Sequence, residues 1–229
     1  MRSIIISSMK PVLFIMTILD FFFLFKMFQE YRTKRNSQSL LVGLICIGLF
    51  YDSLILFLGN LMPFGNVLKF LSQFRYIFHC FLIPLLFPVC FDAINISKKY
   101  QKIIWILTLI IMLVGLISGI AVVTTPVSIG NLNRYASSAL TPAFSQKVTS
   151  LLDTVPVFFM IGIGTYILMK KKNPNMMLSG IFMLVFTLLG IFLGKDPSGD
   201  PTKSLMFYIS MYGESLMVFF LYRFIQSEN

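Results

Sequence analysis

The sequence predicts an all-α integral membrane protein, a single bundle of seven transmembrane helices with the N terminus outside and the C terminus in the cytoplasm. Apolar residues make up 57% of the 229 residues and charged residues 12%, about half the charged share usual in soluble domains. Seven apolar stretches reach the roughly 20 residues that a helix needs to cross a bilayer. The basic residues are concentrated in alternate loops.

Each apolar stretch is expected to be a helix, because it lacks the alternation of a membrane β-strand and is about twice as long as one. The first stretch has no small-residue cleavage pattern, so it is expected to remain as a span and not to be removed as a signal peptide. No inverted repeat divides the chain, which predicts a single domain, 1–229. The expected helices are residues 11–29, 40–60, 67–94, 102–124, 150–169, 175–194 and 204–225.

The third stretch, 67–94, is the longest and is expected to tilt or to project beyond the bilayer. Pro84 and Pro88 each remove a backbone hydrogen bond, so a kink is expected between residues 80 and 88. In the fourth stretch, Gly115 and Gly119 lie four residues apart, a spacing that favours close packing between helices.

Two loops on the expected outer side are long. The segment 125–149 is rich in Ser, Thr, Asn and Pro, and it is expected to be either a lid or partner surface or a solvated linker. The segment 194–203 contains Asp-Pro twice and Ser-Gly once, which predicts turns.

The orientation is predicted from the basic residues, because Lys and Arg remain on the cytoplasmic side. Of the 19 basic residues, seven lie at the expected outer ends and Arg75 lies within a helix. The other eleven lie at the expected inner ends, where contact with anionic lipid is also expected. They are Lys26, Arg32, Lys34, Arg35, Lys98, Lys99, Lys102, Lys170, Lys171, Lys172 and Arg223. Topology therefore explains the net charge of +10, and no nucleic-acid partner is expected.

Motifs for metal, nucleotide or nucleophilic chemistry are missing from the sequence. The three cysteines, Cys46, Cys80 and Cys90, lie within apolar stretches at spacings that suit packing and no metal site. A single histidine cannot supply a multi-histidine zinc site, so no metal is expected. Neither a phosphate-binding glycine loop nor a serine-nucleophile motif occurs.

Five of the nine acidic residues lie within the expected helices: Asp20, Asp52, Asp92, Asp153 and Glu214. An ionisable group within the bilayer costs at least about 2.5 to 3.5 kcal/mol, so it is expected to face the bundle interior and a partner. Asp92 and Asp153 lie near the ends of their expected helices. Both are therefore expected to reach interfacial water and to have a structural role.

The other three acidic residues are expected at a depth similar to that of Arg75 and His79. Arg75 and His79 share one helix face about 6 Å apart along the axis, and Tyr76 extends its polar character. Three carboxyl groups with one arginine and one histidine exceed what simple ion pairing needs. Such a cluster is typical of a ligand site, an ion site or a proton relay, and buried ion pairs that fix helix packing are the alternative. The candidate site residues are Asp20, Asp52, Arg75, Tyr76, His79 and Glu214.

The stretch FRYIFHCFLIPLL (residues 74–86) resembles the third helix of the microbial rhodopsins, in which Arg-Tyr is followed by an aromatic residue and then Pro-Leu-Leu. The matching residues are Arg75, Tyr76, Phe81, Pro84, Leu85 and Leu86. The expected helix number and orientation are similar to that family, as is an acidic residue in the last helix, Glu214. The resemblance implies a bundle around a central pocket, with Arg75, Asp52 and Glu214 near its outer side.

The chain departs from that family where the chromophore would bind. No lysine lies between Lys203 and Arg223, so the last helix cannot form the retinal Schiff base. Phe78 stands where an acidic counterion would be expected, and the one tryptophan, Trp105, lies at the start of the fourth helix. The sixth helix has no proline. Neither retinal nor another cofactor is therefore expected.

Three functions fit these features. The preferred one is non-enzymatic: the cluster binds a small ligand, lipid or ion, in a sensor or in a proton- or ion-handling protein. The second is an intramembrane enzyme acting on a lipid or another apolar substrate, with His79 or a carboxyl group as general acid and base. The third is a structural subunit of a membrane complex. The short loops and the lack of a targeting segment favour a bacterial-type plasma membrane.

Overall fold

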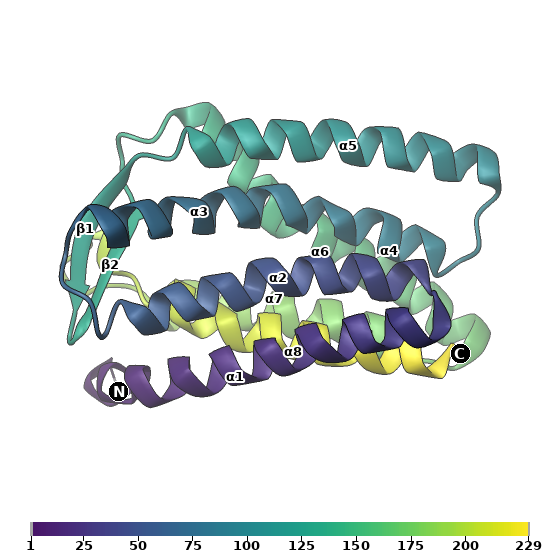
Figure 1. Cartoon of the computed structure of the whole chain (residues 1–229), viewed down its shortest axis with the longest axis horizontal. Coiled ribbons are helices and arrows are strands. Elements are labelled where there is room, and N and C mark those ends of the chain that lie inside the picture. Colours follow the sequence, from purple (N-terminus) through teal and green to yellow (C-terminus); the bar gives the residue numbers. More distant parts are fainter. Residues whose placement is uncertain (1, 229) are drawn as a thin grey trace.

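The computed structural model describes residues 2–228, so Met1 and Asn229, the two ends of the expected domain, lie outside the described residues. A helix covers each of the seven apolar stretches, and one β-hairpin lies at the end of the bundle that also holds the N terminus (Figure 1). The elements are α1 (Arg2–Lys34), α2 (Ser37–Leu58), α3 (Asn66–Leu82), η1 (Ile83–Leu85), α4 (Leu86–Asp92), α5 (Lys98–Ile120), β1 (Thr124–Ile129), β2 (Leu132–Ser137), α6 (Ala143–Lys171), α7 (Asn175–Leu193), η2 (Pro201–Lys203) and α8 (Met206–Ser227).

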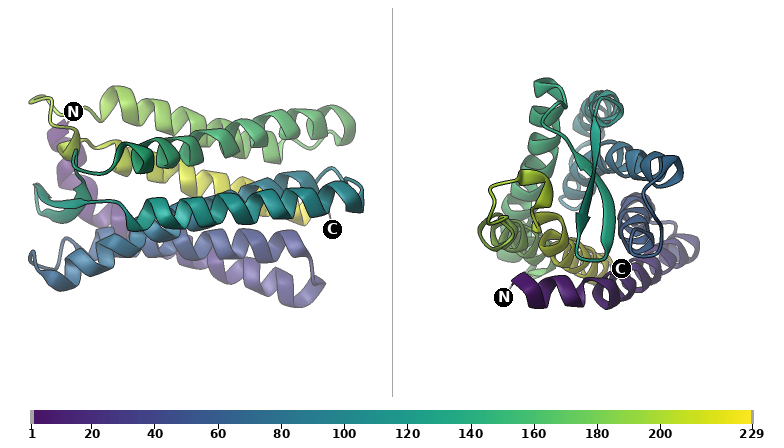
Figure 2. Two further views of the ribbon diagram at one scale, coloured as in Figure 1. Left: turned by 90° about the horizontal axis from the view of Figure 1, so that it is seen from above. Right: turned by 90° about the vertical axis from the view of Figure 1, so that its left-hand side faces the viewer.

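The helices form a ring in chain order. Helix α1 packs on α2, α2 on α3, α3 on α5, α5 on α6, α6 on α7 and α7 on α8, and α8 closes the ring against α1. The end-on view in Figure 2 shows this arrangement with the hairpin across the near end. The two ends of the chain lie at opposite ends of the bundle (Figure 1). Short connections between antiparallel helices produce this order, because sequence neighbours become neighbours in space.

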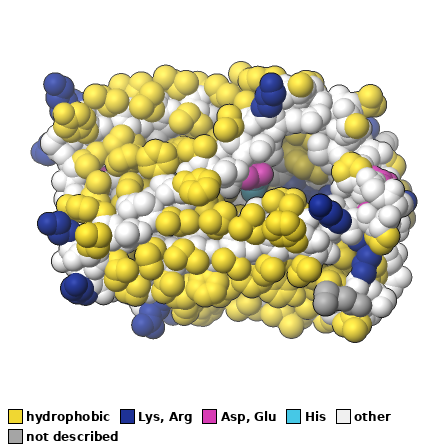
Figure 3. All heavy atoms as spheres, turned by 180° about the vertical axis from the view of Figure 1, so that it is seen from behind, with side chains coloured by type: hydrophobic (Ala, Val, Ile, Leu, Met, Phe, Trp, Pro, Cys, Tyr) yellow, Lys and Arg dark blue, Asp and Glu magenta, His cyan; other side chains and the backbone are white. Residues whose placement is uncertain are grey.

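The outer surface of the bundle is apolar. Within residues 2–228, six helices are long and apolar enough to cross a membrane, namely α1, α2, α3 with α4, α5, α6 and α7. Large side chains such as Phe21 and Ile106 are more than half exposed. Figure 3 shows a broad hydrophobic surface, with Lys and Arg side chains mostly towards its two ends. An apolar surface of this extent fits lipid and not water, so the bundle belongs to the integral membrane class.

The kink expected in the third helix is present. Helix α3 ends at Leu82, a single 3₁₀ turn follows at Pro84, and α4 continues the same span. The carbonyl oxygen of Cys80, which loses its partner because Pro84 has no N–H, lies against Gly115 of α5. A Cβ at Gly115 would lie 2.1 Å from that oxygen, and a Cβ at Gly119 would lie 2.8 Å from the Cα of Ile77. The two glycines therefore serve helix packing within the chain.

The segment 125–149, which was expected to be a long loop, contains a β-hairpin and the start of α6. Residues Thr124–Ile129 and Leu132–Ser137 pair as antiparallel strands, and Gly130 forms the turn with φ of 58°. Helix α6 then begins at Ala143, seven residues before the expected start at 150. The polar composition masked an alternation of buried Val127, Ile129 and Leu132 with polar neighbours, which is the pattern of a half-buried hairpin.

The hairpin covers the end of the bundle at which α1 begins. Its apolar face packs on α1, α2 and α8, with Val127, Ile129 and Leu132 buried against Met9, Leu56 and Tyr208. Asn133 fixes the hairpin to the end of α2: its backbone N–H donates to the Gly59 carbonyl at 3.0 Å, and its side chain donates to the Met62 carbonyl at 3.1 Å. Because these contacts lie at the mouth of the ring, the hairpin acts as a cover.

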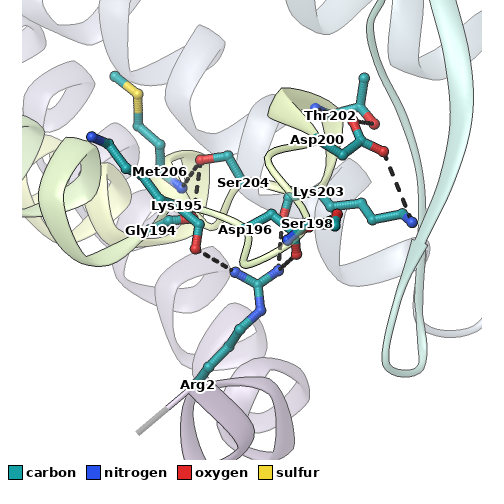
Figure 4. Close-up of polar contacts among 10 residues, drawn as sticks. All are labelled: Arg2, Gly194, Lys195, Asp196, Ser198, Asp200, Thr202, Lys203, Ser204 and Met206. Atoms are coloured by element: carbon teal, nitrogen blue, oxygen red, sulfur yellow. Dashed lines mark hydrogen bonds and ion pairs between the residues drawn. The ribbon is translucent and has the colours of Figure 1, made fainter.

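A polar clamp joins the start of α1 to the loop between α7 and α8 (Figure 4). Arg2 forms an ion pair with Asp196 at 2.7 Å and donates to the carbonyl oxygens of Lys195 and Lys203 at 2.9 and 2.8 Å. The Asp-Pro turns expected in 194–203 are stabilised by side-chain caps, since Asp200 accepts from the backbone N–H of Thr202 at 2.9 Å. The clamp holds the first and last helices together at the end that the hairpin covers.

The half of the bundle away from the hairpin is filled mainly by apolar side chains. Met27, Val42, Val89, Leu221 and Phe224 are each almost completely buried in one continuous cluster. All three cysteines are free and buried, as expected for packing residues. The buried ionisable groups of the interior lie between this cluster and the hairpin.

Candidate functional site

Arg75 and Asp52 form the first ion pair of the interior. Nε of Arg75, on α3, lies 2.6 Å from Oδ1 of Asp52, on α2. The side chains are 7% and 18% exposed, so the pair is largely buried. The predicted partnership between Arg75 and an acidic residue of the second helix is therefore a direct contact with Asp52. Nη1 of Arg75 is buried and has no hydrogen-bond partner in the described part of the chain.

His79 and Asp153 form the second pair, which the sequence analysis missed. Nε2 of His79 lies 2.8 Å from Oδ1 of Asp153 on α6. The sequence predicts Asp153 near a helix end, and this is wrong because α6 begins at Ala143, ten residues before Asp153. Pro142 immediately before that first residue was the signal for the earlier start, since Pro is favoured at helix N-termini.

Asp20 lies on the opposite side of the interior, on α1. Its Oδ1 accepts a hydrogen bond from Ser215 Oγ of α8 at 3.1 Å, while the Ser53 hydroxyl of α2 donates to the Phe50 carbonyl at 3.1 Å. The side chain is 5% exposed and has no basic partner in the ion pairs of residues 2–228. A buried carboxyl group needs hydrogen-bond partners to offset the loss of water, and the Ser215 hydroxyl is one such partner.

Glu214 connects these groups. It lies on α8, and its side chain interacts electrostatically with Asp52, His79, Asp20 and Asp153. No ion pair or hydrogen bond to its side chain is present within residues 2–228. The structure therefore brings Asp20, Asp52, Arg75, His79 and Glu214 into one electrostatically coupled cluster and adds Asp153 to it.

A narrow pocket lies between the second pair and Glu214. His79, Asp153 and Glu214 supply its polar lining, and its apolar lining comes mainly from Ile83, Leu86, Leu152, Pro156, Val157, Met183 and Met217. Water can occupy about 20 Å³ of it, which is room for about one molecule. In Figure 3 a hollow in the hydrophobic face, near the middle of the bundle, has acidic and histidine side chains at its floor. The side chains of His79 and Asp153 are 26% and 38% exposed, so the pocket opens sideways.

Tyr76 lies closer to the hairpin than the pocket residues do. Its hydroxyl donates to the carbonyl oxygen of Tyr135 in β2 at 3.2 Å, and it interacts with the guanidinium group of Arg134. Of the six predicted site residues, Tyr76 is thus the one that contacts the cover. Arg134 was assigned to the outer loop by the sequence analysis, and only the strand pairing shows that it belongs beside the polar interior.

Metal binding has no support from the geometry. No group of three or more His, Cys, Asp or Glu side chains that could hold a metal ion occurs among residues 2–228. The donor set of the pocket is one imidazole and two carboxyl groups, and one of those carboxyl groups is engaged by the imidazole. The chemistry available here is therefore hydrogen bonding, charge pairing and proton transfer.

Together, the fold and the site define a helical membrane bundle with a coupled set of ionisable groups in its interior and a sideways opening to them. The chain matches no protein-family model and no curated protein sequence.

Proposed function

We propose that this protein is a non-enzymatic sensor or binding protein of seven spans, whose His79–Asp153–Glu214 pocket takes a small amphiphilic ligand from the lipid. The observation that carries the proposal is the opening of a charged pocket through an apolar, lipid-length surface. Ionisable groups exposed to hydrocarbon are costly, so such an opening is maintained only when a polar group covers it. The polar end of an amphiphile meets that need while its apolar part stays in the lipid.

The charge of the pocket indicates the ligand class. Two carboxyl groups face one imidazole, and the imidazole is already bonded to Asp153. Glu214 is left as the unpaired acceptor, which favours a ligand group that donates hydrogen bonds or carries positive charge, such as an amine or a hydroxyl. The surrounding side chains, Leu152, Val157 and Met217 among them, suit an alkyl or ring portion.

A role in signalling fits this geometry better than passage through the bundle. Among the described residues, the interior beyond the cluster is closed by the apolar side chains around Met27 and Phe224, which leaves no polar route to the far end. Binding in a pocket with room for about one water requires α6 and α7 to separate or α4 to shift at its kink. Ligand occupancy would then be coupled to a change in helix position.

The topology within this proposal has seven spans, with the hairpin outside. Helix α8 has 22 residues and packs in the ring with the six apolar helices, and an odd number of spans puts the two ends of the chain on opposite sides. The eleven basic residues at the far end favour the cytoplasm there and contact with anionic lipid.

Labelling intact cells with an impermeant maleimide tests this orientation: Asn131→Cys in the hairpin turn should react, and Lys99→Cys should not. The reverse pattern would overturn the orientation.

The ligand itself is tested by mass spectrometry of small molecules retained by gently purified protein. We expect a species enriched with the wild-type chain, lost with Glu214→Gln and retained with the control Thr154→Ala, which changes a lipid-facing neighbour of Asp153. Glu214→Gln keeps the size of the side chain, so the loss would report charge and not packing. An identical profile for all three proteins would contradict the ligand proposal. Retention of a partner protein in place of a small molecule would instead favour a structural subunit.

One observation favours an enzyme as the second candidate. The 2.8 Å contact between His79 and Asp153 is the arrangement by which a carboxylate orients an imidazole for general-base catalysis, and it faces the lipid. In that case purified protein should convert a lipid substrate, and His79→Gln should abolish the conversion while the protein remains folded. Equal turnover by wild type and His79→Gln would exclude His79 as the base.

A further inference from the structure

Arg134 enters the interior from the hairpin and not from a helix. In the strand register it lies opposite Val127, a buried residue of the face that packs on the bundle. Its guanidinium carbon lies 3.8 Å from the centre of the phenyl ring of Phe207, in the first turn of α8. The Arg134 side chain therefore reaches across the end of the helix bundle that the hairpin covers. The hairpin thus holds a positive charge over the polar interior.

Two arginines at this place have buried donors with no acceptor. Nε and Nη1 of Arg134 and Nη1 of Arg75 are buried and lack a hydrogen-bond partner in the part of the chain that the structure describes. Arg75 as a whole is 7% exposed. Buried polar groups in folded proteins are almost always paired, and an unpaired charged donor is especially costly. Three such donors on two neighbouring guanidinium groups therefore indicate a missing acceptor.

The local charges point in the same direction. Burial lowers the pKa of Arg134 to about 10; the Tyr76 hydroxyl opposes this, and the charge of Arg75 adds to the lowering. Arg134 therefore remains positive at neutral pH and lies close enough to feel Arg75. Asp52 is the acidic group that acts on Arg134, and its Oδ1 is already held by Nε of Arg75 at 2.6 Å. Glu214 acts on Arg75 from the pocket side. Arg75 and Arg134 thus share the single carboxylate of Asp52, so positive charge exceeds negative charge beneath the hairpin.

We propose that a small monovalent anion, a halide or a carboxylate group, binds beneath the hairpin between Nη1 of Arg75 and the Nε and Nη1 donors of Arg134. Water can accept hydrogen bonds from these donors but cannot balance their charge, whereas an anion does both. Tyr76 closes the side of the site towards β2, since its hydroxyl bonds to the Tyr135 carbonyl at 3.2 Å. Because Arg134 belongs to the cover, the anion would link the hairpin to α3 and stabilise the closed mouth.

This site is separate from the lateral pocket. None of the residues that line the pocket belongs to the hairpin, and Arg134 and Arg75 are not among them. The anion proposal therefore does not rest on the proposed function: either one can fail alone.

The test is the melting temperature of the full chain in detergent as chloride replaces isethionate, an organic sulfonate without a carboxylate group, at constant ionic strength. We expect a rise of about 4 °C or more that grows with the logarithm of the chloride concentration, because a ligand that binds only the folded state stabilises it. Acetate in place of chloride then distinguishes a carboxylate from a halide as the bound anion. A rise with chloride alone assigns a halide site, and a rise with acetate assigns a carboxylate site.

Arg134→Met should abolish the rise, since it keeps an unbranched side chain at this position but removes the guanidinium group that lies over Phe207. Lys203→Met removes a positive charge from the exposed loop before α8 and should keep the rise. Where Arg134→Met fails to fold, bromide soaked into wild-type crystals and located by anomalous scattering gives a direct answer. Equal melting temperatures in chloride, acetate and isethionate, a response retained in Arg134→Met, or bromide missing from the Arg75–Arg134 gap would overturn the proposal.

Discussion

Nε2 of His79 and Oδ1 of Asp153 lie 2.8 Å apart, although 74 residues separate them in the chain. They come from α3 and α6, which α5 separates in chain order, and α6 packs against η1 and α4, which continue the span of α3. Their contact is the polar edge of a pocket that opens sideways through an apolar surface, and it supports the proposed binding of an amphiphile.

Replacing Asp153 by Asn should destabilise the bundle moderately. The change removes the charge from a hydrogen bond to His79, and such bonds contribute about 1.5 to 3 kcal/mol when fully buried. Because the side chains are 26% and 38% exposed, a loss near about 1 kcal/mol is expected, and it would be measured as a lower free energy of unfolding in mixed micelles. Thr154→Ala, at an exposed neighbour, should have no such effect. Equal stability of Asp153→Asn and wild type would show that the pair contributes nothing to folding.

Replacing Asp52 should have a larger effect than replacing Asp153. Asp52→Ala leaves the buried guanidinium group of Arg75 without its 2.6 Å partner, and removing one member of a buried pair costs about 3 to 5 kcal/mol. The double variant Asp52→Ala with Arg75→Met should recover much of that loss, because it leaves no unpaired charge. A double-mutant cycle of unfolding free energies measures the coupling. Strictly additive losses would mean that the two residues do not stabilise each other.

Gly115 should tolerate no larger side chain. A Cβ there would lie 2.1 Å from the carbonyl oxygen of Cys80, so Gly115→Ala must push α3 and α5 apart and should cost about 1 to 3 kcal/mol. Gly162 is the matched control, since it lies within a helix where a Cβ would meet no neighbouring element within 4 Å. Gly162→Ala should therefore raise stability by about 0.5 to 1 kcal/mol. Thermal unfolding of the two variants compares them directly. Similar melting temperatures for both would contradict the close approach of α3 and α5.

The polar clamp between Arg2 and the loop before α8 should weaken in acid. The Ser198 hydroxyl first, then the Ser198 backbone N–H and Arg2, hold the pKa of Asp196 below its ordinary value. A lowered pKa means that the charged carboxylate stabilises the folded loop at pH above the ordinary aspartate value of about 3.9, and that this contribution is lost as the pH falls through the lowered value. Amide exchange of residues 195–204 should therefore be faster in Asp196→Asn than in wild type at about pH 6.

The same comparison in stronger acid provides the control for the clamp. Once Asp196 is protonated, wild type and Asp196→Asn should exchange at the same rate, because neither then has a negative charge for Arg2. A difference that persists unchanged into strong acid would show that the ion pair with Arg2 does not hold the loop.

Local sequence patterns were sufficient to predict the helices and the class of protein. Apolar runs of membrane length leave no structure but a helix that satisfies the backbone in lipid, so a helix occurs at every expected stretch. The kink at Pro84 was equally predictable, because proline removes a specific backbone hydrogen bond whatever surrounds it. The spacing of Gly115 and Gly119 likewise predicted a close helix contact, which occurs with α3. The resemblance to microbial rhodopsins and the seven-span topology stay predictions.

Which charged groups meet depends on the packing of the whole ring. A sequence gives the depth of Asp52, Arg75 or Glu214 along its own helix, but the direction of each side chain is set by how the helices pack together. The expectation for Asp153 failed because a helix start lies seven residues earlier, and such boundaries depend on weak local signals. Arg134 reaches the interior because the hairpin folds its alternate residues inward, which depends on strand register against the bundle. Long-range packing, which no local pattern encodes, therefore assembles the site.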